Sequence, residues 1–180
     1  AELTILQNAL QSNIILEHSC GTGQCGACKA KLLTGNIEFD DKYNILTESE
    51  RSNGIFLTCT SKALSDVQME AEYLPELAGI QKKTVPCKID SVDFPVPDVA
   101  VLHLRLPPTA NFNYLPGQYI DLMYNGIARS YSIASASAEN NVFELHVRKV
   151  EGGTFSNFVF NEFTPNQLLR IQGPAGTFFV

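Results

Sequence analysis

The sequence predicts two folded units in series: a small α+β unit over residues 1–78 and an all-β antiparallel barrel over residues 79–180. Three observations predict this division. Cysteine and glycine gather in residues 20–28, short alternating segments begin near residue 88, and acidic side chains concentrate in the first part. Residues 1–76 carry eleven acidic and five basic side chains, whereas residues 77–180 carry eight of each. Such a change in charge is typical of a boundary between two domains.

Overall composition narrows the class of protein. The chain has 180 residues, of which 44% are hydrophobic and 18% charged, as in ordinary globular domains. Its net charge of -6 argues against nucleic acid or an anionic membrane as a partner. The sequence holds no apolar run of about 18 residues, so it predicts no membrane-spanning helix. The first residues lack the features of a signal peptide, and we therefore expect a cytoplasmic protein.

The first unit contains signals for two short helices and two strands. Thr4 can cap a helix over residues 5–10, whose apolar positions share one face. A strand is expected over Lys29–Leu33, ending at Gly35-Asn36. Thr47 and Glu50 form a capping box that starts a second helix, which ends at Gly54. The apolar segment Ile55–Cys59 follows as a second strand.

The second unit follows a linker over residues 74–83, which has no strong period and contains Pro, Gly and a basic pair. Beyond the linker, apolar and polar side chains mostly alternate in short segments that are separated by Pro-Pro, Pro-Gly, Asn-Gly and Asn-Asn turns. This spacing predicts an antiparallel barrel of about six strands with one helix near residues 155–161. The alternating segments are residues 88–92, 100–106, 118–122 and 141–147.

The cysteine spacing predicts an iron–sulfur site. Cys20, Cys25 and Cys28 form a C-x4-C-x2-C pattern, and Cys59 follows after 30 further residues. This is the spacing of plant-type 2Fe-2S ferredoxins, in which four thiolates hold the two irons. The glycines of the loop allow positive φ and bring backbone amides close to the sulfurs.

Two other uses of cysteine are less compatible with this sequence. A disulfide framework is rare in a chain without an export signal. A structural zinc site favours two separated C-x2-C pairs, whereas only Cys25 and Cys28 have that spacing. Cys87 fits neither pattern, and we expect it to be a small buried residue of the barrel.

A second motif lies in the expected strand over residues 127–133. Alternation places Arg129 and Tyr131 on one face and Ser132 on the other. A guanidinium group can bind a diphosphate through paired hydrogen bonds, and an aromatic ring can stack on an isoalloxazine. Ser132 could reach the polar edge of such a ring. These residues alone are a weak signal, because a tyrosine on a barrel strand is often simply packed.

Residues downstream strengthen that signal. Gly152 and Gly153 lead into the expected helix, where free amides and the helix dipole favour an anion. Thr154 and Ser156 add hydroxyl groups at the same place. The two motifs together predict a site for a phosphate-bearing aromatic cofactor.

These motifs resemble a known family. Residues 84–180 are similar to the FAD-binding barrel of the ferredoxin-NADP reductase superfamily, and residues 1–76 resemble a plant-type ferredoxin. The resemblance implies a β-grasp fold for the first unit. It also implies that Arg129, Tyr131 and Ser132 contact the pyrophosphate and isoalloxazine of FAD. The resemblance implies two further groups of FAD contacts, which are His146, Val147 and Arg148, and Gly152, Gly153, Thr154 and Ser156. It also implies that the cluster ligands are Cys20, Cys25, Cys28 and Cys59.

Module order implies the activity. Reductases with an N-terminal 2Fe-2S domain pass electrons from NAD(P)H through FAD and the cluster to a partner protein. Several segments, among them residues 73–77, 81–88, 104–110 and 144–150, resemble the branch whose partner is a pyridoxamine-phosphate-dependent dehydrase. That dehydrase acts on a CDP-sugar in 3,6-dideoxyhexose biosynthesis. The acidic first unit could steer this docking, with Asp40 and Asp41 as candidate surface charges.

Two alternatives remain at this point. The same module order serves bacterial oxygenases, whose hydroxylase component would then accept the electrons. A non-enzymatic electron carrier would need no flavin site, which the motifs at Arg129 and Gly152 argue against.

The resemblance also predicts what this chain lacks. Relatives begin with a β-hairpin ahead of the first helix and continue into a nicotinamide-binding domain. We expect both to be absent here, which would leave sheet edges of the first unit unpaired and weaken its hold on a cluster.

Overall fold

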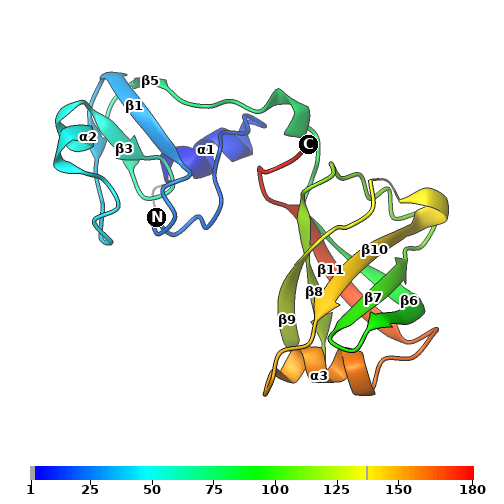
Figure 1. The fold of residues 1–180 in the computed structure, drawn as a ribbon. Helices are drawn as coiled ribbons and strands as arrows, with labels where there is room; N and C mark the ends of the chain where they lie inside the picture. Colours follow the sequence, from blue (N-terminus) through cyan, green and yellow to red (C-terminus); the bar gives the residue numbers. More distant parts are fainter. Residues whose placement is uncertain (1–2, 137) are drawn as a thin grey trace. The chain divides into compact units, whose positions relative to one another are not determined.

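The computed structural model describes residues 3–136 and 138–180 (Figure 1). The chain divides into two compact units, Ala1–Gly79 and Ile80–Val180. The sequence placed this boundary between residues 78 and 79. Within the described residues, no helix is long and apolar enough to cross a membrane.

The first unit is an α+β unit built around a three-stranded antiparallel sheet. Strand β1 (Lys29–Thr34) lies between β3 (Ile55–Leu57) and β5 (Gln68–Glu70). A second, two-stranded sheet pairs β2 with β4. The remaining elements are β2 (Ile37–Glu38), β4 (Lys62–Ala63), α1 (Ile5–Gln11), α2 (Glu48–Ser52) and the short 3-10 helix η1 (Pro75–Leu77).

Both helices of this unit start with reciprocal capping boxes. At α1, the Gln7 amide donates to the Thr4 hydroxyl at 3.2 Å, and the Thr4 amide donates to the Gln7 side chain at 2.9 Å. At α2, the Glu50 amide donates to the Thr47 hydroxyl at 3.2 Å, and the Thr47 amide donates to the Glu50 carboxylate at 2.8 Å. The capping box predicted at Thr47 is therefore confirmed, and both boxes satisfy amides that a helix start leaves unpaired.

The predicted strand over residues 55–59 is shorter in the structure. β3 ends at Leu57, and the chain turns because the amides of Thr60 and Ser61 both donate to the Leu57 carbonyl. Cys59 therefore lies on a tight turn rather than on a strand. The start of α1 docks on the same turn, since the Leu6 amide donates to the Thr58 carbonyl at 2.9 Å.

The second unit is a six-stranded antiparallel sheet in the order β10-β7-β6-β11-β8-β9. Its two edge strands approach each other at one isolated bridge, Ile133 to Leu145, which curls the sheet into a barrel. Helix α3 (Thr154–Asn161) lies across one end of the strands (Figure 1). The strands are β6 (Lys83–Val96), β7 (Val99–Arg105), β8 (Tyr119–Tyr124), β9 (Ile127–Ser132), β10 (Val142–Arg148) and β11 (Leu168–Ala175).

The barrel core confirms the predicted alternation. Every second residue of β7 is buried, and the same holds at Phe143, Leu145 and Val147 of β10. Cys87 is 2% exposed within this core, as expected from the sequence. Strand β6 is much longer than the predicted residues 88–92 because two register shifts let it bend around the barrel.

Candidate functional site

The predicted cysteine ligands lie on two segments of the first unit. Cys20, Cys25 and Cys28 belong to the loop before β1, and Cys59 lies on the turn after β3. β1 and β3 are paired neighbours, which brings the two segments together. The Cys28 thiol donates to the Cys59 sulfur at 3.0 Å, and both residues are buried. Cys20 and Cys25 are exposed.

Backbone amides of the loop point at sulfur. The amides of Thr22 and Gln24 both lie 3.4 Å from the Cys20 sulfur, and the Cys20 amide lies 3.5 Å from the Cys25 sulfur. Hydrogen bonds from Thr22, through its side chain and its amide, lower the pKa of Cys20 to about 6. The loop therefore stabilises a thiolate before any metal is considered, which is the state that an iron ligand requires.

The pKa of the buried Cys59 is shifted in the opposite direction. Burial raises the pKa of Cys59 to about 12, and the adjacent Cys28 sulfur contributes in the same direction. An apolar setting disfavours the charged thiolate, so the Cys59 thiol holds its proton unless a cation replaces it. A metal centre would supply that positive charge.

Two glycines let the loop fold against its surroundings. Gly23 has φ +81°, and a Cβ added there would lie 2.8 Å from Cγ2 of Thr60. Gly26 has φ +73°, and its added Cβ would lie 3.0 Å from Cγ2 of Ile45. A larger residue would be strained at either position, and it would press on the turn after Cys59 from Gly23 and on Ile45 from Gly26.

The donor set fits a cluster with two metals. Across the described part of the chain, no three His, Cys, Asp or Glu side chains converge as a single ion would need. A 2Fe-2S cluster instead takes two thiolates at each of two irons, so its ligands need not surround one point. The close Cys28 and Cys59 sulfurs, the two exposed cysteines and the amides directed at sulfur meet that requirement.

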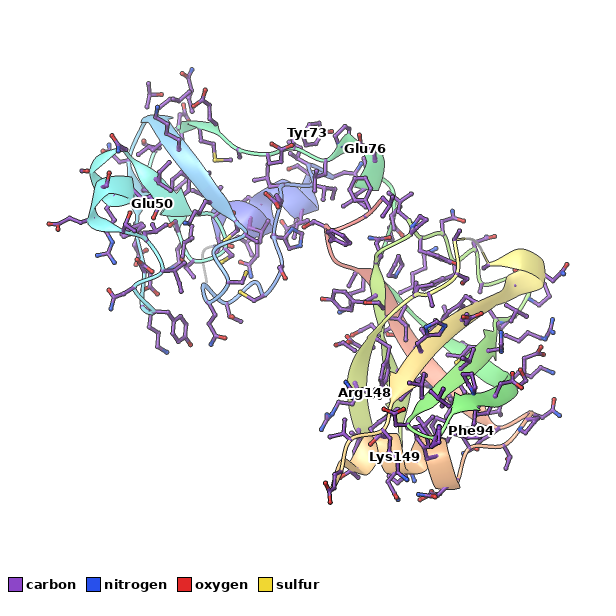
Figure 2. All side chains as sticks on the ribbon, viewed as in Figure 1. Glu50, Tyr73, Glu76, Phe94, Arg148 and Lys149 are labelled. Atoms are coloured by element: carbon purple, nitrogen blue, oxygen red, sulfur yellow. The ribbon has the colours of Figure 1, made fainter. Side chains whose placement is uncertain are left out.

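The second candidate site lies where the barrel seam opens. Beyond the Ile133 to Leu145 bridge, no strand pairing joins β9 to the last residues of β10 in the ranges that the structure describes. Both strands are edges of the sheet, and their backbones are free to receive a ligand there. Figure 2 marks Arg148 and Lys149 at this end of β10, close to α3.

Strand β9 presents the predicted flavin residues along this seam. The Tyr131 ring is half-buried, and its centroid lies 5.9 Å from that of Phe155. Burial raises the pKa of Tyr131, so the phenol stays neutral at physiological pH. Arg129 is exposed, with its guanidinium donating to the Ala128 carbonyl at 2.8 Å, and Ser132 is also exposed. The rigid ring and the accessible guanidinium suit stacking and phosphate binding respectively.

The predicted contacts on β10 differ in accessibility. Val147 is fully buried and points into the core, so only its backbone can meet a ligand. His146 is exposed, and its Nε2 lies 2.5 Å from Oε1 of Glu144. The Arg148 side chain is 81% exposed and pairs weakly with Asp98 at 3.5 Å. Arg148 is therefore available to a phosphate at little cost.

The start of α3 has the form of an anion site. Gly153 occupies the N-cap position, and among the described side chains none caps the helix. Gly152 has φ +70°, which turns the chain into the helix, and Thr154 is exposed at its first position. Amides of the first turn therefore remain available to a phosphate.

Ser156 has a different place from the one its motif suggests. It is 5% exposed, and its hydroxyl accepts from the Val150 amide at 3.2 Å. The same oxygen lies 3.2 Å from the carbonyls of Val150 and Gly153. In this structure the hydroxyl closes the loop that presents the glycines.

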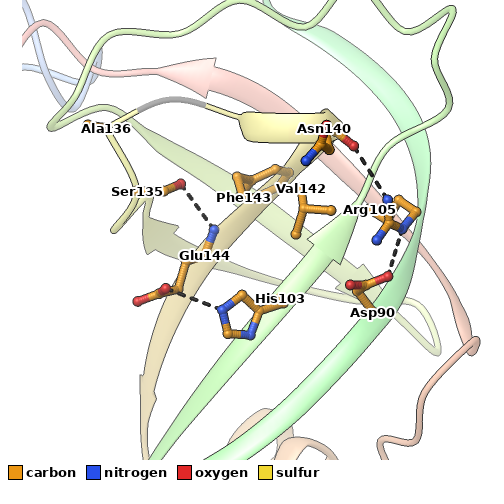
Figure 3. A pocket seen from close by; sticks show the side chains of 9 residues that line it. All are labelled: Asp90, His103, Arg105, Ser135, Ala136, Asn140, Val142, Phe143 and Glu144. Carbon is orange, nitrogen blue, oxygen red and sulfur yellow. Dashed lines mark hydrogen bonds and ion pairs between the residues drawn. The ribbon is translucent and has the colours of Figure 1, made fainter.

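A groove of about 420 Å³, lined in part by Glu144, the partner of His146, was not indicated by any sequence signal (Figure 3). Its charges are matched in pairs. Arg105 donates to Asp90 at 2.6 Å, and Nε2 of His103 lies 3.3 Å from Oε2 of Glu144. We assign the groove no function.

Comparison with known families identifies the kind of domain to which each unit belongs. Residues 1–64 match the family described as "2Fe-2S iron-sulfur cluster binding domain", and residues 86–180 match "Oxidoreductase FAD-binding domain". The second match alone covers more than half of the chain. The first unit is thus a ferredoxin-type cluster-binding domain, and the barrel is an FAD-binding domain, as the sequence predicted.

Individual relatives share both domains in the same order. The "CDP-6-deoxy-L-threo-D-glycero-4-hexulose-3-dehydrase reductase" of Yersinia pseudotuberculosis is 56% identical over 98% of this chain and 54% of its own length. "Protein RfbI" of Salmonella typhimurium is 48% identical over 98% of this chain and 52% of its own length. The reductase component 1 of terephthalate 1,2-dioxygenase from Comamonas is 34% identical over 97% of this chain and 52% of its own length. The chain thus spans about half the length of the curated relatives it matches.

Two solved reductase structures are similar to nearly the whole chain. The Amycolatopsis cytochrome P450 reductase GcoB is 26% identical with a TM-score of 0.66, over 98% of this chain and 54% of the other. The ferredoxin reductase in carbazole 1,9a-dioxygenase is 27% identical with a TM-score of 0.60, over 99% and 57% of the two chains.

Proposed function

The chain belongs to the oxidoreductase FAD-binding family and carries a 2Fe-2S domain ahead of its barrel, and from this we propose that it is part of an NAD(P)H-dependent electron-transfer reductase. Its partner would be a cytoplasmic pyridoxamine-phosphate-dependent dehydrase that acts on a CDP-sugar in 3,6-dideoxyhexose biosynthesis. The observation that carries this choice is the 56% identity, over nearly the whole chain, to a reductase named for that dehydrase. The five free thiols agree with a reducing compartment.

Cys20, Cys25, Cys28 and Cys59 would hold the cluster. Their role is to supply four thiolates from two segments that β1 and β3 fix side by side. The amides of Thr22 and Gln24 donate to sulfur and so favour a more negative charge on the site. When bound, FAD accepts two electrons as a hydride and the cluster passes them singly, which is why such a reductase needs both groups.

The barrel residues would hold FAD along the open seam. Tyr131 would offer its ring to the isoalloxazine, and the exposed Ser132 hydroxyl would be available to a polar atom of that ring. Arg129 would supply positive charge to the diphosphate. The backbone of β10 at His146, Val147 and Arg148 would line the side of the seam opposite β9. The amides that follow Gly152 and Gly153, with the Thr154 hydroxyl, bind the phosphates, and Ser156 holds that loop in place.

The first test is an absorbance spectrum of the anaerobically reconstituted chain, before and after stoichiometric dithionite. We expect flavin bands near about 450 nm with a bleachable iron–sulfur shoulder. Cys59→Ser should lose iron and keep FAD, whereas Arg129→Ala should weaken FAD binding and keep iron. Loss of both chromophores from either variant, or neither chromophore in the wild type, would contradict the assignment of two separate sites.

The choice of partner needs a second test. The dithionite-reduced chain should reoxidise faster with a CDP-sugar dehydrase than with an oxygenase component, as followed by stopped-flow absorbance. The oxygenase alternative is supported by the 34% identity to a dioxygenase reductase component, and faster reoxidation by the oxygenase would favour it.

A further inference from the structure

The segment between β2 and α2, residues 40–46, is organised by one carboxylate. We call this segment the strap. The Asp41 side chain is only 2% exposed, and its two oxygens accept from the amides of Ile45 at 2.8 Å and Leu46 at 3.1 Å. Arg51 of α2 donates to the same carboxylate at 2.6 Å and to the Asn44 side chain at 3.1 Å. Asp41 thus ties both ends of the strap to each other and to α2.

This placement corrects the sequence-based view of Asp41. Its position beside Asp40 suggested a pair of surface charges that could steer a partner. Burial raises the pKa of the Asp41 carboxyl, but the two amides and then Arg51 outweigh it and hold the pKa below its usual value. The carboxylate is therefore charged and enclosed, and of the two only Asp40 is exposed.

The strap contacts both segments that carry cysteine. The Thr60 hydroxyl donates to the Asp40 carbonyl at 2.6 Å, and Thr60 directly follows Cys59. On the cysteine loop, Cβ atoms added at Gly26 and Gly23 would lie 3.0 Å from Ile45 and 3.9 Å from Tyr43. The Ile45 side chain of the strap therefore packs closely over the loop at Gly26, where a larger residue would displace it, and the Tyr43 ring lies near Gly23.

Two residues at the end of the strap pack in the apolar core of the first unit, which also contains Cys28 and Cys59. Leu46 is 4% exposed and belongs to the apolar cluster that contains Cys28 and Cys59. Ile45 packs against the same cluster. The two amides that donate to Asp41 are those of Ile45 and Leu46, so the carboxylate fixes two residues of the apolar cluster that contains Cys28 and Cys59.

We propose that Asp41 is a positioning residue for the iron–sulfur site. By clamping the strap, it sets the spacing between the loop of Cys20, Cys25 and Cys28 and the turn of Cys59. The nature of the bound group rests on the proposed function, whereas the mechanical coupling of the strap to the loop does not.

Hydrogen exchange on the cluster-free chain tests the coupling alone. In Asp41→Ala, amides of residues 20–28 and 58–60 should exchange faster, in addition to those of Ile45 and Leu46. The matched control is Asp40→Ala, which removes the same charge from the exposed neighbouring residue and should leave exchange in these segments unchanged. Faster exchange confined to the strap would overturn the proposal.

A milder variant covers the case in which Asp41→Ala does not fold. Arg51→Gln removes one donor and leaves both strap amides in place. It should speed exchange at the same loop amides to a smaller degree. Wild-type exchange of the loop in Arg51→Gln, with faster exchange only at α2, would also overturn the proposal.

The reconstituted chain supplies the readouts specific to the cluster. Loss of groups that orient metal ligands commonly costs tenfold or more in metal retention, so we expect iron release to a chelator to be about tenfold faster in Asp41→Ala. The midpoint potential, measured by EPR-monitored titration, should shift more than in Asp40→Ala, although both variants lose one negative charge. Equal release rates, or equal shifts of potential, would overturn the proposal.

The two hypotheses fail in different ways. A wild-type chain that takes up no 2Fe-2S cluster would refute the proposed function, and the exchange experiment would still decide the role of Asp41. Iron uptake with identical release and exchange in Asp41→Ala and Asp40→Ala would refute only the role of Asp41.

Discussion

Ser156→Ala separates two roles for a buried hydroxyl at the start of α3. The Ser156 oxygen accepts one hydrogen bond from the Val150 amide and donates one to a carbonyl of the same loop, that of Val150 or of Gly153. Each such bond contributes about 0.5–1.5 kcal/mol net, so its loss should cost the cofactor-free barrel about 1–3 kcal/mol. The loop that presents Gly152 should loosen, and FAD affinity should fall about tenfold, which corresponds to about 1.4 kcal/mol.

The assay is urea unfolding without cofactor, together with FAD titration by flavin fluorescence. Thr154→Ala is the matched control, because it removes an exposed hydroxyl two residues before Ser156 in the same helix and breaks no hydrogen bond of the loop. It should lower FAD affinity while leaving the stability of the cofactor-free barrel unchanged. Loss of FAD affinity in Ser156→Ala at wild-type stability would show that the hydroxyl is a direct phosphate ligand and would refute its role in holding the loop.

Three further predictions concern local features of the chain. Alkylation of the cluster-free protein at pH 7.5, followed by mass spectrometry, should be fast at Cys20, whose pKa is about 6. It should be undetectable at Cys87, where burial raises the pKa to about 12. Hydrogen bonds from Lys29 and the Thr47 cap hold the pKa of Glu50 at about 2, below the ordinary 4.5. Glu50 therefore stabilises the fold above about pH 4.5 and loses this effect as pH falls through 2, so Glu50→Gln should be less stable than wild type in urea at pH 6 and equal to it near pH 2. Gly35→Ala should destabilise the first unit by about 2–4 kcal/mol in the same assay, because the added Cβ would lie 2.3 Å from a backbone carbonyl oxygen at φ +97°.

Local signals explain which elements could be predicted. The Thr47 capping box depends on residues three positions apart, and the buried positions of β7 follow a simple alternation. Both are properties of the chain itself, and both predictions are confirmed. Strand β11 was missed although its burial also alternates in part, because Gly173-Pro174 near its end resembles a turn. Pairing with β6 and β8 on both sides decides that it is a strand.

At the candidate sites, too, local sequence signals could be predicted, whereas features that depend on tertiary contacts could not. Cysteine spacing indicated the kind of centre, but it could not indicate the strap, because the partners of Asp41 come together only when the segment between β2 and α2 closes. Ser156 was placed in the right region by its motif, whereas its hydrogen bonds to the loop depend on the turn at Gly152. The seam between β9 and β10 arises from closure of the whole barrel, which no local pattern encodes.

At both candidate sites, backbone amides help to offset negative charge, beside the cysteines of the first site and the arginines of the second. The first unit carries eleven acidic and five basic side chains, so its net charge opposes a site of four thiolates. The nearby compensation comes from amides such as those of Thr22 and Gln24, fixed at 3.4 Å from sulfur. Contacts this short are hardly screened by salt, whereas steering between acidic and basic surfaces acts over about 10 Å and is screened. Raising the salt concentration from about 0.05 to 0.5 M should therefore leave the rate of cluster release nearly unchanged. The same change should slow electron transfer to a partner protein that docks through a basic surface. Cluster release that accelerates as strongly as partner reduction slows would show that side-chain charges, rather than the amides of Thr22 and Gln24, offset the charge of the thiolates.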